Sequence, residues 1–456
     1  MCVPPPFRRA VLCLLVATAP LWAGPAAAQT SAPTGLVGPP LATRFVLPNG
    51  LVVLVAERPA LPIVIVRVAL GAGAVLDPPD KPGLANLTAL LLTRGTQTRT
   101  GPEIDRAIEF VGGSLGAEGG RDTSEASVSV LKRDFGLGLE LLADVLVRPT
   151  FPPAEFERRR EETRAAVQRS EEDPETVTGR LFRRLIFPGH PYSAPIQGTD
   201  ESLGRITRDD VAAFYGAAYR PDSMVVAVVG DVTVAEVRAA LTARLGGWRP
   251  GPAGVTPPGG VTFGTPARTE MVKRDLTQAT VYLGQATVTR PHPDYYPLVV
   301  GSHILGGGSS SRLYARVREE RGLAYSVFAQ YAPGRYGGMF LAGFQSENAR
   351  VREVLALVRE ELVRLRGDRV EGDELARAKA YLIGSFPLRM DTNAEVAELL
   401  LTIERFGLGL DYPTRYRQAI EAVTADDILR AVRAHWNPDA MSLAVVADLG
   451  QAGLSP

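Results

Sequence analysis

The chain has 456 residues, with 50 lysines and arginines balanced by 50 aspartates and glutamates, and 45% of its residues are hydrophobic. This is the composition of a globular protein, and it excludes a disordered or fibrous chain. The zero net charge argues against a dedicated nucleic-acid binder. The length predicts two or three domains.

Residues 1–28 have the pattern of a secretory signal peptide. An arginine pair at 8–9 precedes the apolar run 10–22, and the small residues 26–28 form an A-x-A cleavage site. We therefore expect an exported, periplasmic protein, and the arginine pair leaves the twin-arginine route open beside the general one.

Both cysteines, Cys2 and Cys13, lie within this leader. The mature chain is accordingly expected to have no disulfide and no thiolate metal site. No later stretch reaches the roughly 18 apolar residues that a membrane span requires, so no membrane span is predicted.

Strands and helices alternate through the first half of the chain. Runs of β-branched residues at 51–56 and 63–70 predict two strands, and the apolar–serine alternation at 126–130 predicts a half-buried third. Between them, Thr100 and Glu103 form a capping box that predicts the start of a helix.

A long internal repeat is the most informative feature of the sequence. The pattern of segment 206–229 recurs at 423–446. Each copy has a threonine (Thr207, Thr424) that predicts a helix N-cap, a Pro-Asp turn 14 residues later, and then an apolar strand. The offset of 217 residues (424 − 207) is far longer than a solenoid period and predicts a duplicated domain.

The segment 249–265 is too rich in proline and glycine for a packed element and is predicted to be a linker. The two domains are then expected to cover 41–248 and 266–450. Each contains both helices and strands, so the predicted fold class is α+β, twice.

Metal ligands are scarce in this sequence. The four histidines include no pair three or four residues apart, the spacing that places two ligands on one face of a helix. We therefore expect all four to have structural roles, His190 and His292 in proline-rich turns and His303 and His435 on helices.

Two further patterns are similar to catalytic or nucleotide-binding motifs. Residues 112–116 read G-x-S-x-G, which would make Ser114 a candidate nucleophile. A nucleophile elbow needs a strand before its serine and a helix after it, whereas here a helix is expected to end at Gly112 and a strand to follow. The run 306–308 lacks the Lys-Ser/Thr of a phosphate-binding loop.

Two segments read together resemble one known family. Residues 82–96 resemble the zinc-helix segment of the insulinase/pitrilysin family of inverted zincin peptidases, and 305–326 resemble the signature of its second domain. The segments 48–51 and 190–192 are also similar to it. The resemblance covers nearly the whole mature chain and implies two duplicated domains, each an antiparallel-rich sheet with helices packed on it.

The family's H-x-x-E-H motif holds zinc with two histidines and supplies a glutamate as general base. In this chain the two histidine positions are Asn86 and Leu90, and the glutamate position is Ala89. Glu162 lies where the resemblance puts the third ligand, but a single carboxylate cannot hold zinc. We expect this chain to bind no metal cofactor and to be inactive alone, with zinc in a partner chain.

The substrate side of the family pattern is retained. The resemblance implies an arginine and a tyrosine seven residues apart that reach the bound peptide, and Arg318 and Tyr325 have this spacing. A guanidinium and a phenol can hold a carbonyl or a developing oxyanion. The resemblance also implies close approach of the substrate backbone to the glycine-rich loop made by Gly306, Gly307, Gly308 and Ser309.

Three hypotheses follow. The first is a non-catalytic, substrate-binding subunit of a periplasmic zinc metallopeptidase, a heterodimer whose partner chain carries H-x-x-E-H and whose substrate is a peptide. The second is a peptide-binding or scaffold protein without peptidase activity. The third is a serine hydrolase using Ser114.

Overall fold

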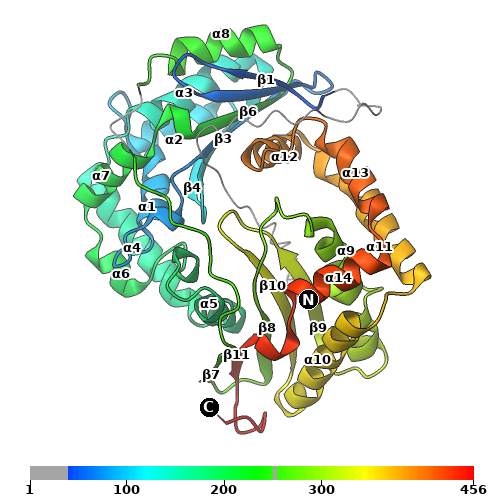
Figure 1. Cartoon of the computed structure of the whole chain (residues 1–456). Helices are drawn as coiled ribbons and strands as arrows, with labels where there is room; N and C mark the ends of the chain where they lie inside the picture. Colours follow the sequence, from blue (N-terminus) through cyan, green and yellow to red (C-terminus); the bar gives the residue numbers. More distant parts are fainter. Residues whose placement is uncertain (1–39, 250–253, 456) are drawn as a thin grey trace, which may run out of the picture.

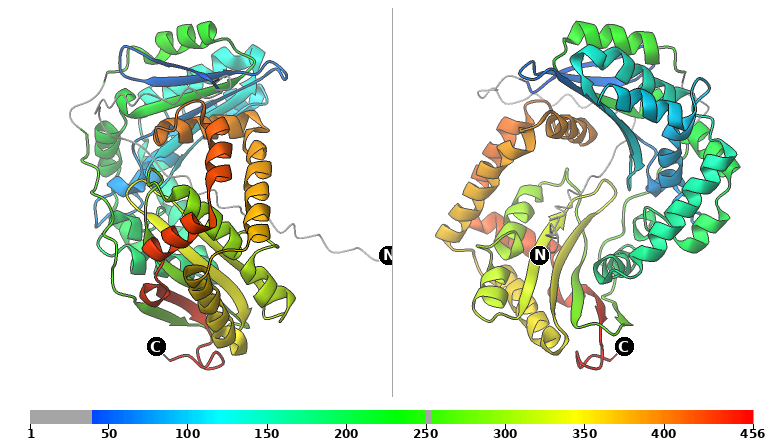
Figure 2. Two further views of the ribbon diagram at one scale, coloured as in Figure 1. Left: turned by 45° about the vertical axis from the view of Figure 1, so that its right-hand side comes forward. Right: turned by 180° about the vertical axis from the view of Figure 1, so that it is seen from behind.

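The computed structural model describes residues 40–249 and 254–455, so the predicted signal peptide lies outside the described residues. The chain forms two mixed sheets with helices packed on them, in two halves that face each other (Figures 1 and 2). The predicted α+β class with two duplicated domains is confirmed.

The first sheet has six strands in the order β1-β2-β6-β3-β5-β4. The pair β2–β6 is parallel and every other neighbouring pair is antiparallel. The three strands expected from the sequence are present as β2, β3 and β5, with limits within a few residues of those expected. The strands are β1 Thr43–Val46, β2 Val52–Glu57, β3 Ile63–Leu70, β4 Ser114–Gly119, β5 Ser124–Leu131 and β6 Met224–Gly230.

The second sheet repeats this order without a counterpart of β1, as β7-β11-β8-β10-β9. Its single parallel pair, β7–β11, corresponds to β2–β6. The first residues of β2 and β7 are again 217 positions apart (269 − 52), which confirms the duplication. The strands are β7 Thr269–Lys273, β8 Gln278–Thr287, β9 Ala324–Ala332, β10 Gly338–Glu347 and β11 Ser442–Ala447.

The helices begin where local signals place them. The capping box of Thr100 precedes α2, and Thr207 and Thr424 cap α7 and α14 with matching aspartates at the third helical position. The first half contains α1 Leu84–Leu91, α2 Gly101–Phe110, α3 Phe135–Val147, α4 Pro153–Ser170, α5 Pro174–Ile186, α6 Asp200–Arg205, α7 Arg208–Ala218 and α8 Val234–Leu245. The second contains α9 Tyr295–Gly306, α10 Val351–Gly367, α11 Gly372–Ser385, α12 Asn393–Arg405, α13 Tyr412–Ala422 and α14 Ala425–His435.

Each sheet has one face covered by helices of its own half and the other covered by a helix from the opposite half. Helix α5 packs Leu181 and Phe182 on Tyr282 and Leu341 of the second sheet. Helix α12 packs on the first sheet in the same way, as Figure 1 shows at its upper right. Because both faces are covered, β6 and β11 are buried along their whole length, which explains their predominantly apolar sequences.

The described part of the predicted linker, 254–265, contains no helix or strand.

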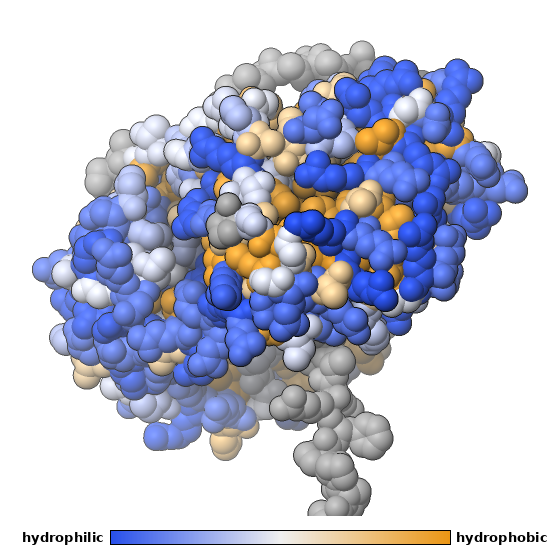
Figure 3. All heavy atoms as spheres, turned by 90° about the horizontal axis from the view of Figure 1, so that it is seen from below, coloured by the Kyte–Doolittle hydropathy of each residue, from blue (hydrophilic) through white to orange (hydrophobic). Residues whose placement is uncertain are grey.

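The view from below shows hydrophilic residues over most of the surface and apolar residues gathered in the middle of that face (Figure 3). In the part of the chain that the structure describes, every helix is too short or too polar to cross a membrane.

Candidate functional site

A half-buried aspartate, Asp77, precedes helix α1 and caps its first turn. Asp77 accepts hydrogen bonds from the backbone N–H groups of Gly83 (2.8 Å) and Ala85 (2.7 Å), donors that the first turn of the helix leaves free. Burial raises the pKa of Asp77 to about 7, although both hydrogen bonds oppose this shift. Gly83 has φ 100°, a left-handed conformation that favours glycine.

The residues of α1 at the family's zinc positions cannot hold zinc. Asn86 and Ala89 are buried and Leu90 is half-buried. Strand β4 packs closely against this helix. A Cβ added to Gly119 would lie only 2.3 Å from the Cα of Asn86. One amide and two hydrocarbon side chains in a packed contact do not provide the donors of a zinc site.

Glu162, on α4, is engaged in ion pairs. Its carboxylate lies 2.6 Å from Arg158 and 3.0 Å from Arg159, and 44% of its side chain is exposed. Within the described residues it belongs to no group of three metal-capable side chains. The structure therefore places it as a charge on the solvated face of α4.

Ser114 is the first residue of β4, and α2 ends four residues before it, at Phe110. A helix thus precedes the serine and a strand follows, the reverse of a nucleophile elbow. No described residue forms a side-chain hydrogen bond with Ser114 that would activate its hydroxyl. Its role as a nucleophile has no geometric support.

Arg318 lies in a six-residue π-helix, Tyr314–Glu319, and Tyr325 is the second residue of β9. The guanidinium of Arg318 sits over two rings, 4.7 Å from the centroid of Tyr325 and 5.0 Å from that of Tyr314. Tyr325 is 77% exposed, so it is a surface group and not part of a strand core. The structure brings the predicted pair into contact at one edge of the second sheet.

The arginines around this pair are neutralised, whereas Arg318 is not. Arg312 pairs with Glu374 at 2.7 Å, Arg316 with Glu361 at 3.0 Å, and Arg321 with Glu353 at 3.4 Å. Among the described residues Arg318 has no carboxylate partner, and its guanidinium lies over the rings of Tyr314 and Tyr325. Its charge is therefore available to a ligand. Short π-helical segments frequently occur at functional sites.

The glycine-rich loop follows α9. Gly306 is buried against β9, where an added Cβ would lie 2.2 Å from the backbone nitrogen of Ala329. Gly307, Gly308 and Ser309 are exposed. The first glycine thus permits close packing of helix and strand, and the next three residues form the accessible part of the loop.

Comparison with known proteins now gives the family. Residues 52–200 match the family described as Insulinase (Peptidase family M16), and residues 205–382 match the Peptidase M16 inactive domain. A Mycobacterium leprae protein named as an uncharacterized zinc protease is 32% identical over 391 residues, which cover 84% of this chain and 87% of that protein. This chain belongs to the insulinase family, peptidase family M16. The resemblance drawn from the motifs is confirmed.

Other M16 relatives agree. The protein YmxG of Bacillus subtilis, named as an uncharacterized zinc protease, is 26% identical over 366 residues, covering 78% of this chain and 88% of YmxG. The crystal structure of a peptidase M16 inactive domain from Pseudomonas fluorescens superposes with a TM-score of 0.84, at 26% identity over 89% of this chain and 97% of that one. A Helicobacter pylori protease shares the fold, with a TM-score of 0.82 at 21% identity over 90% and 99%. The two inactive-domain matches fit a non-catalytic M16 chain.

The four histidines of this M16 chain are placed differently from one another. His190 accepts a hydrogen bond from the backbone of Tyr192 in a turn, as expected, and His303 stacks on Tyr381 with ring centroids 4.5 Å apart. His292 and His435, 143 positions apart (435 − 292), come together at one carboxylate. Sequence spacing missed this pair because its two members lie on different elements that only the tertiary fold brings together.

A buried charged cluster joins the two halves beside β4. Asp122 accepts a 2.5 Å hydrogen bond from the hydroxyl of Tyr192, and its other oxygen has no hydrogen-bond partner. Burial raises the pKa of Asp122 to about 7, against the lowering effects of Tyr192, Arg405, Arg121 and Arg335. Arg335 and Arg405 come from the second half, so this cluster is part of the contact between halves.

Proposed function

We propose that this chain is the non-catalytic, substrate-binding subunit of a heteromeric zinc metallopeptidase exported to the periplasm. It supplies Arg318 and Tyr325 to a site whose zinc and general base belong to a partner chain bearing H-x-x-E-H. The chain alone has no peptidase activity.

The observation that carries this proposal is the contrast between two segments. Helix α1 offers no zinc donor at Asn86, Ala89 and Leu90, whereas Arg318 is an unpaired cation beside the exposed Tyr325. A fixed charge and a phenol can hold a peptide carbonyl or its developing oxyanion. The neighbouring arginines all have a carboxylate counter-ion and Arg318 has none. In a protein that had lost all contact with substrate, this difference would serve no function.

The relatives named as zinc proteases support the part of the proposal that concerns zinc, since their names assign zinc-dependent proteolysis to members of this family. The periplasmic location rests on the signal-peptide pattern at 1–28. A peptide-binding or scaffold protein is the alternative, and it differs in one measurable respect: no mixture with a partner restores peptidase activity.

The experiment is an affinity pull-down of the mature chain from periplasmic extract of its own organism, followed by peptidase assays on any stoichiometric partner that carries H-x-x-E-H. We expect the pair to be active and each chain alone to be inactive. Recovery of the chain by itself, or a pair without activity, would contradict the proposal and favour the scaffold function.

The role of the pair is tested in the reconstituted complex. Arg318→Ala and Tyr325→Phe should lower kcat/KM, with Arg318→Ala costing about 100-fold, the size of effect seen when an oxyanion donor is removed. Arg321→Ala is the matched control, because this arginine lies in the same segment but is paired with Glu353. Equal activity of the Arg318 and Arg321 variants would remove the assigned role.

A further inference from the structure

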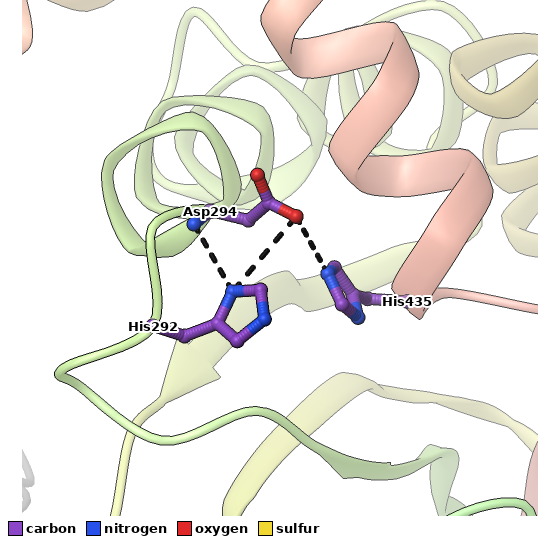
Figure 4. Close-up of side chains that lie close together, drawn as sticks. All are labelled: His292, Asp294 and His435. Atoms are coloured by element: carbon purple, nitrogen blue, oxygen red, sulfur yellow. Dashed lines mark hydrogen bonds and ion pairs between the residues drawn. The ribbon is translucent and has the colours of Figure 1, made fainter.

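The second half contains a side-chain cluster that the proposed function does not use. Figure 4 shows His292, Asp294 and His435 pointing toward one another. His292 and Asp294 lie in the segment between β8 and α9, and His435 is the last residue of α14. One ligand atom from each residue lies within 4.8 Å of the other two.

The centre of the cluster is a buried carboxylate. Asp294 is 4% exposed, and its two oxygens lie within hydrogen-bond distance of Arg430 and His435. Arg430 donates to Oδ1 at 2.5 Å. The second oxygen, Oδ2, is left facing both imidazoles, 2.7 Å from Nε2 of His435 and 3.8 Å from Nδ1 of His292.

One contact in the cluster pairs two acceptors. Nδ1 of His292 accepts a 3.1 Å hydrogen bond from the backbone N–H of Asp294, so it carries a lone pair and no proton. That hydrogen bond engages the single lone pair of Nδ1, so an ion would replace the backbone N–H as its partner; Nδ1 lies 3.8 Å from Oδ2 of Asp294 with no hydrogen between them. A cation held between two such acceptors would turn a repulsive contact into an attractive one.

The donor set and its spacing fit a transition metal ion. Two imidazole nitrogens and one carboxylate oxygen are donors that zinc accepts, with a fourth position left for water. Tetrahedral zinc, with bonds of about 2.0–2.2 Å, separates its donor atoms by about 3.3 Å. The 2.7 and 3.8 Å separations lie on either side of this value, and all three ligand atoms lie within 4.8 Å of one another. Binding of the ion releases the proton that Nε2 of His435 shares with Oδ2 of Asp294. The side chain of His292 is 36% exposed, which gives an ion a route of entry.

We propose that His292, Asp294 and His435 bind one divalent transition metal ion of the zinc class. The ion ties the segment before α9 to the end of α14, and Arg430 orients the carboxylate toward it. This site is separate from the degenerate zinc motif on α1, and it revises the expectation that the chain binds no metal. Its role is structural, since it crosslinks two elements distant in sequence, and it stands whether or not the chain has a peptidase partner.

The test uses the mature chain, stripped with EDTA and prepared without added tag histidines. Titration with Co²⁺ should give ligand-field absorption in the visible range that saturates at one equivalent and is displaced by Zn²⁺. Binding of Zn²⁺ should also raise Tm, because the folded chain alone contains the assembled site.

Variants assign the signal to this cluster. His292→Ala and His435→Ala should each weaken Co²⁺ binding by more than about 100-fold, beyond the loss typical of a group that only supports a ligand. His303→Ala, on helix α9 next to this segment but outside the cluster, is the control and should bind normally. His292 is half-exposed, so its variant stays folded even if His435→Ala does not, and circular dichroism checks both. No saturable binding by the wild type, or equal binding by His292→Ala, would overturn the proposal and leave a hydrogen-bonded trio without metal.

Discussion

Helices α5 and α12 occupy the same place in the repeat but hold the two halves together by different chemistry. Adding 217 to the limits of α5 gives 391–403, and α12 covers 393–405. Helix α5 presents aromatic side chains, with Phe182 edge-to-face on Tyr282 at a centroid distance of 6.1 Å. Helix α12 presents small aliphatic side chains, such as Ala397 and Leu400.

Both contacts have ion pairs at the rim: Arg184 of α5 pairs with Glu270 of β7, and the α12 contact has two such pairs. Arg67 on β3 pairs with Glu398 at 2.5 Å, and Arg44 on β1 pairs with Glu404 at 2.8 Å. The end of α12 reaches the buried cluster around Asp122 through Arg405, which donates to Thr123. One duplicated position has thus become a contact with aromatic side chains in one copy and an aliphatic contact in the other, each with ion pairs at its rim. The fold requires that the sheet face be covered, not that one set of side chains cover it.

The largest expected effect is at the apolar contact. Phe182→Ala should lower the free energy of unfolding by about 3–5 kcal/mol, since the ring is almost fully buried and its loss leaves a cavity. Leu400→Ala in α12 should cost about 2–5 kcal/mol. Urea denaturation measures both. Phe110→Ala is the control, because that ring is 90% exposed and should change stability by less than about 0.5 kcal/mol. A near-neutral Phe182→Ala would show that α5 is not a main contact between the halves.

The charged contact should respond to pH. The pKa of Asp122 is about 7 in the folded chain and near 3.8 when unfolded, so the folded state holds its proton at pH values where the unfolded state has lost it. This group therefore stabilises the fold below pH 4 and loses that contribution as pH rises to 7, by up to about 1.4 kcal/mol per pH unit.

Asp122→Asn should reduce the fall in stability between pH 4 and 7, which denaturation at several pH values measures. Asp427→Asn is the control, because hydrogen bonds to Thr424 lower the pKa of that aspartate and its titration lies below this window. An unchanged slope in Asp122→Asn would mean that this carboxyl is ionised in the folded protein throughout the range.

The two halves also share a close approach of helix to edge strand. In the first half the glycine is Gly119 on β4, against α1, and in the second it is Gly306 at the end of α9, against β9. Gly119→Ala and Gly306→Ala should each cost about 1–3 kcal/mol, because the added methyl would lie 2.3 or 2.2 Å from backbone atoms. Thermal unfolding tests this, with Gly308→Ala as a control that meets only a side-chain atom at 3.9 Å. A cost in one half alone would show that the copies are packed differently.

The smallest effect is expected at the outer rim of α12. Arg44→Ala removes the pair with Glu404 and should cost less than about 1 kcal/mol, since the side chain of Arg44 is 43% exposed. The loss should shrink further in high salt, where exposed charges are screened. A salt-independent loss would point to packing by the arginine stem instead of to its charge.

Much of this protein was determined by short-range features of its sequence. The N-caps Thr207 and Thr424 and the apolar runs of β6 and β11 follow from residue type and local pattern, so they were predicted and confirmed. Their common spacing of 217 residues is a repeat that can be read directly from the sequence. The absence of zinc donors at Asn86, Ala89 and Leu90 is likewise a matter of residue type, which no folding can change.

Only the tertiary structure decided which distant groups meet. The apolar stripe of α5 predicts that one face of this helix is buried. It does not predict that this face packs on the sheet of the other half of the chain. The sequence supplies arginines throughout 312–321, and packing alone leaves Arg318 without a carboxylate. His292 and His435 reach one aspartate because α9 and α14 pack together. Such contacts depend on long-range packing, which residue spacing along the chain does not encode.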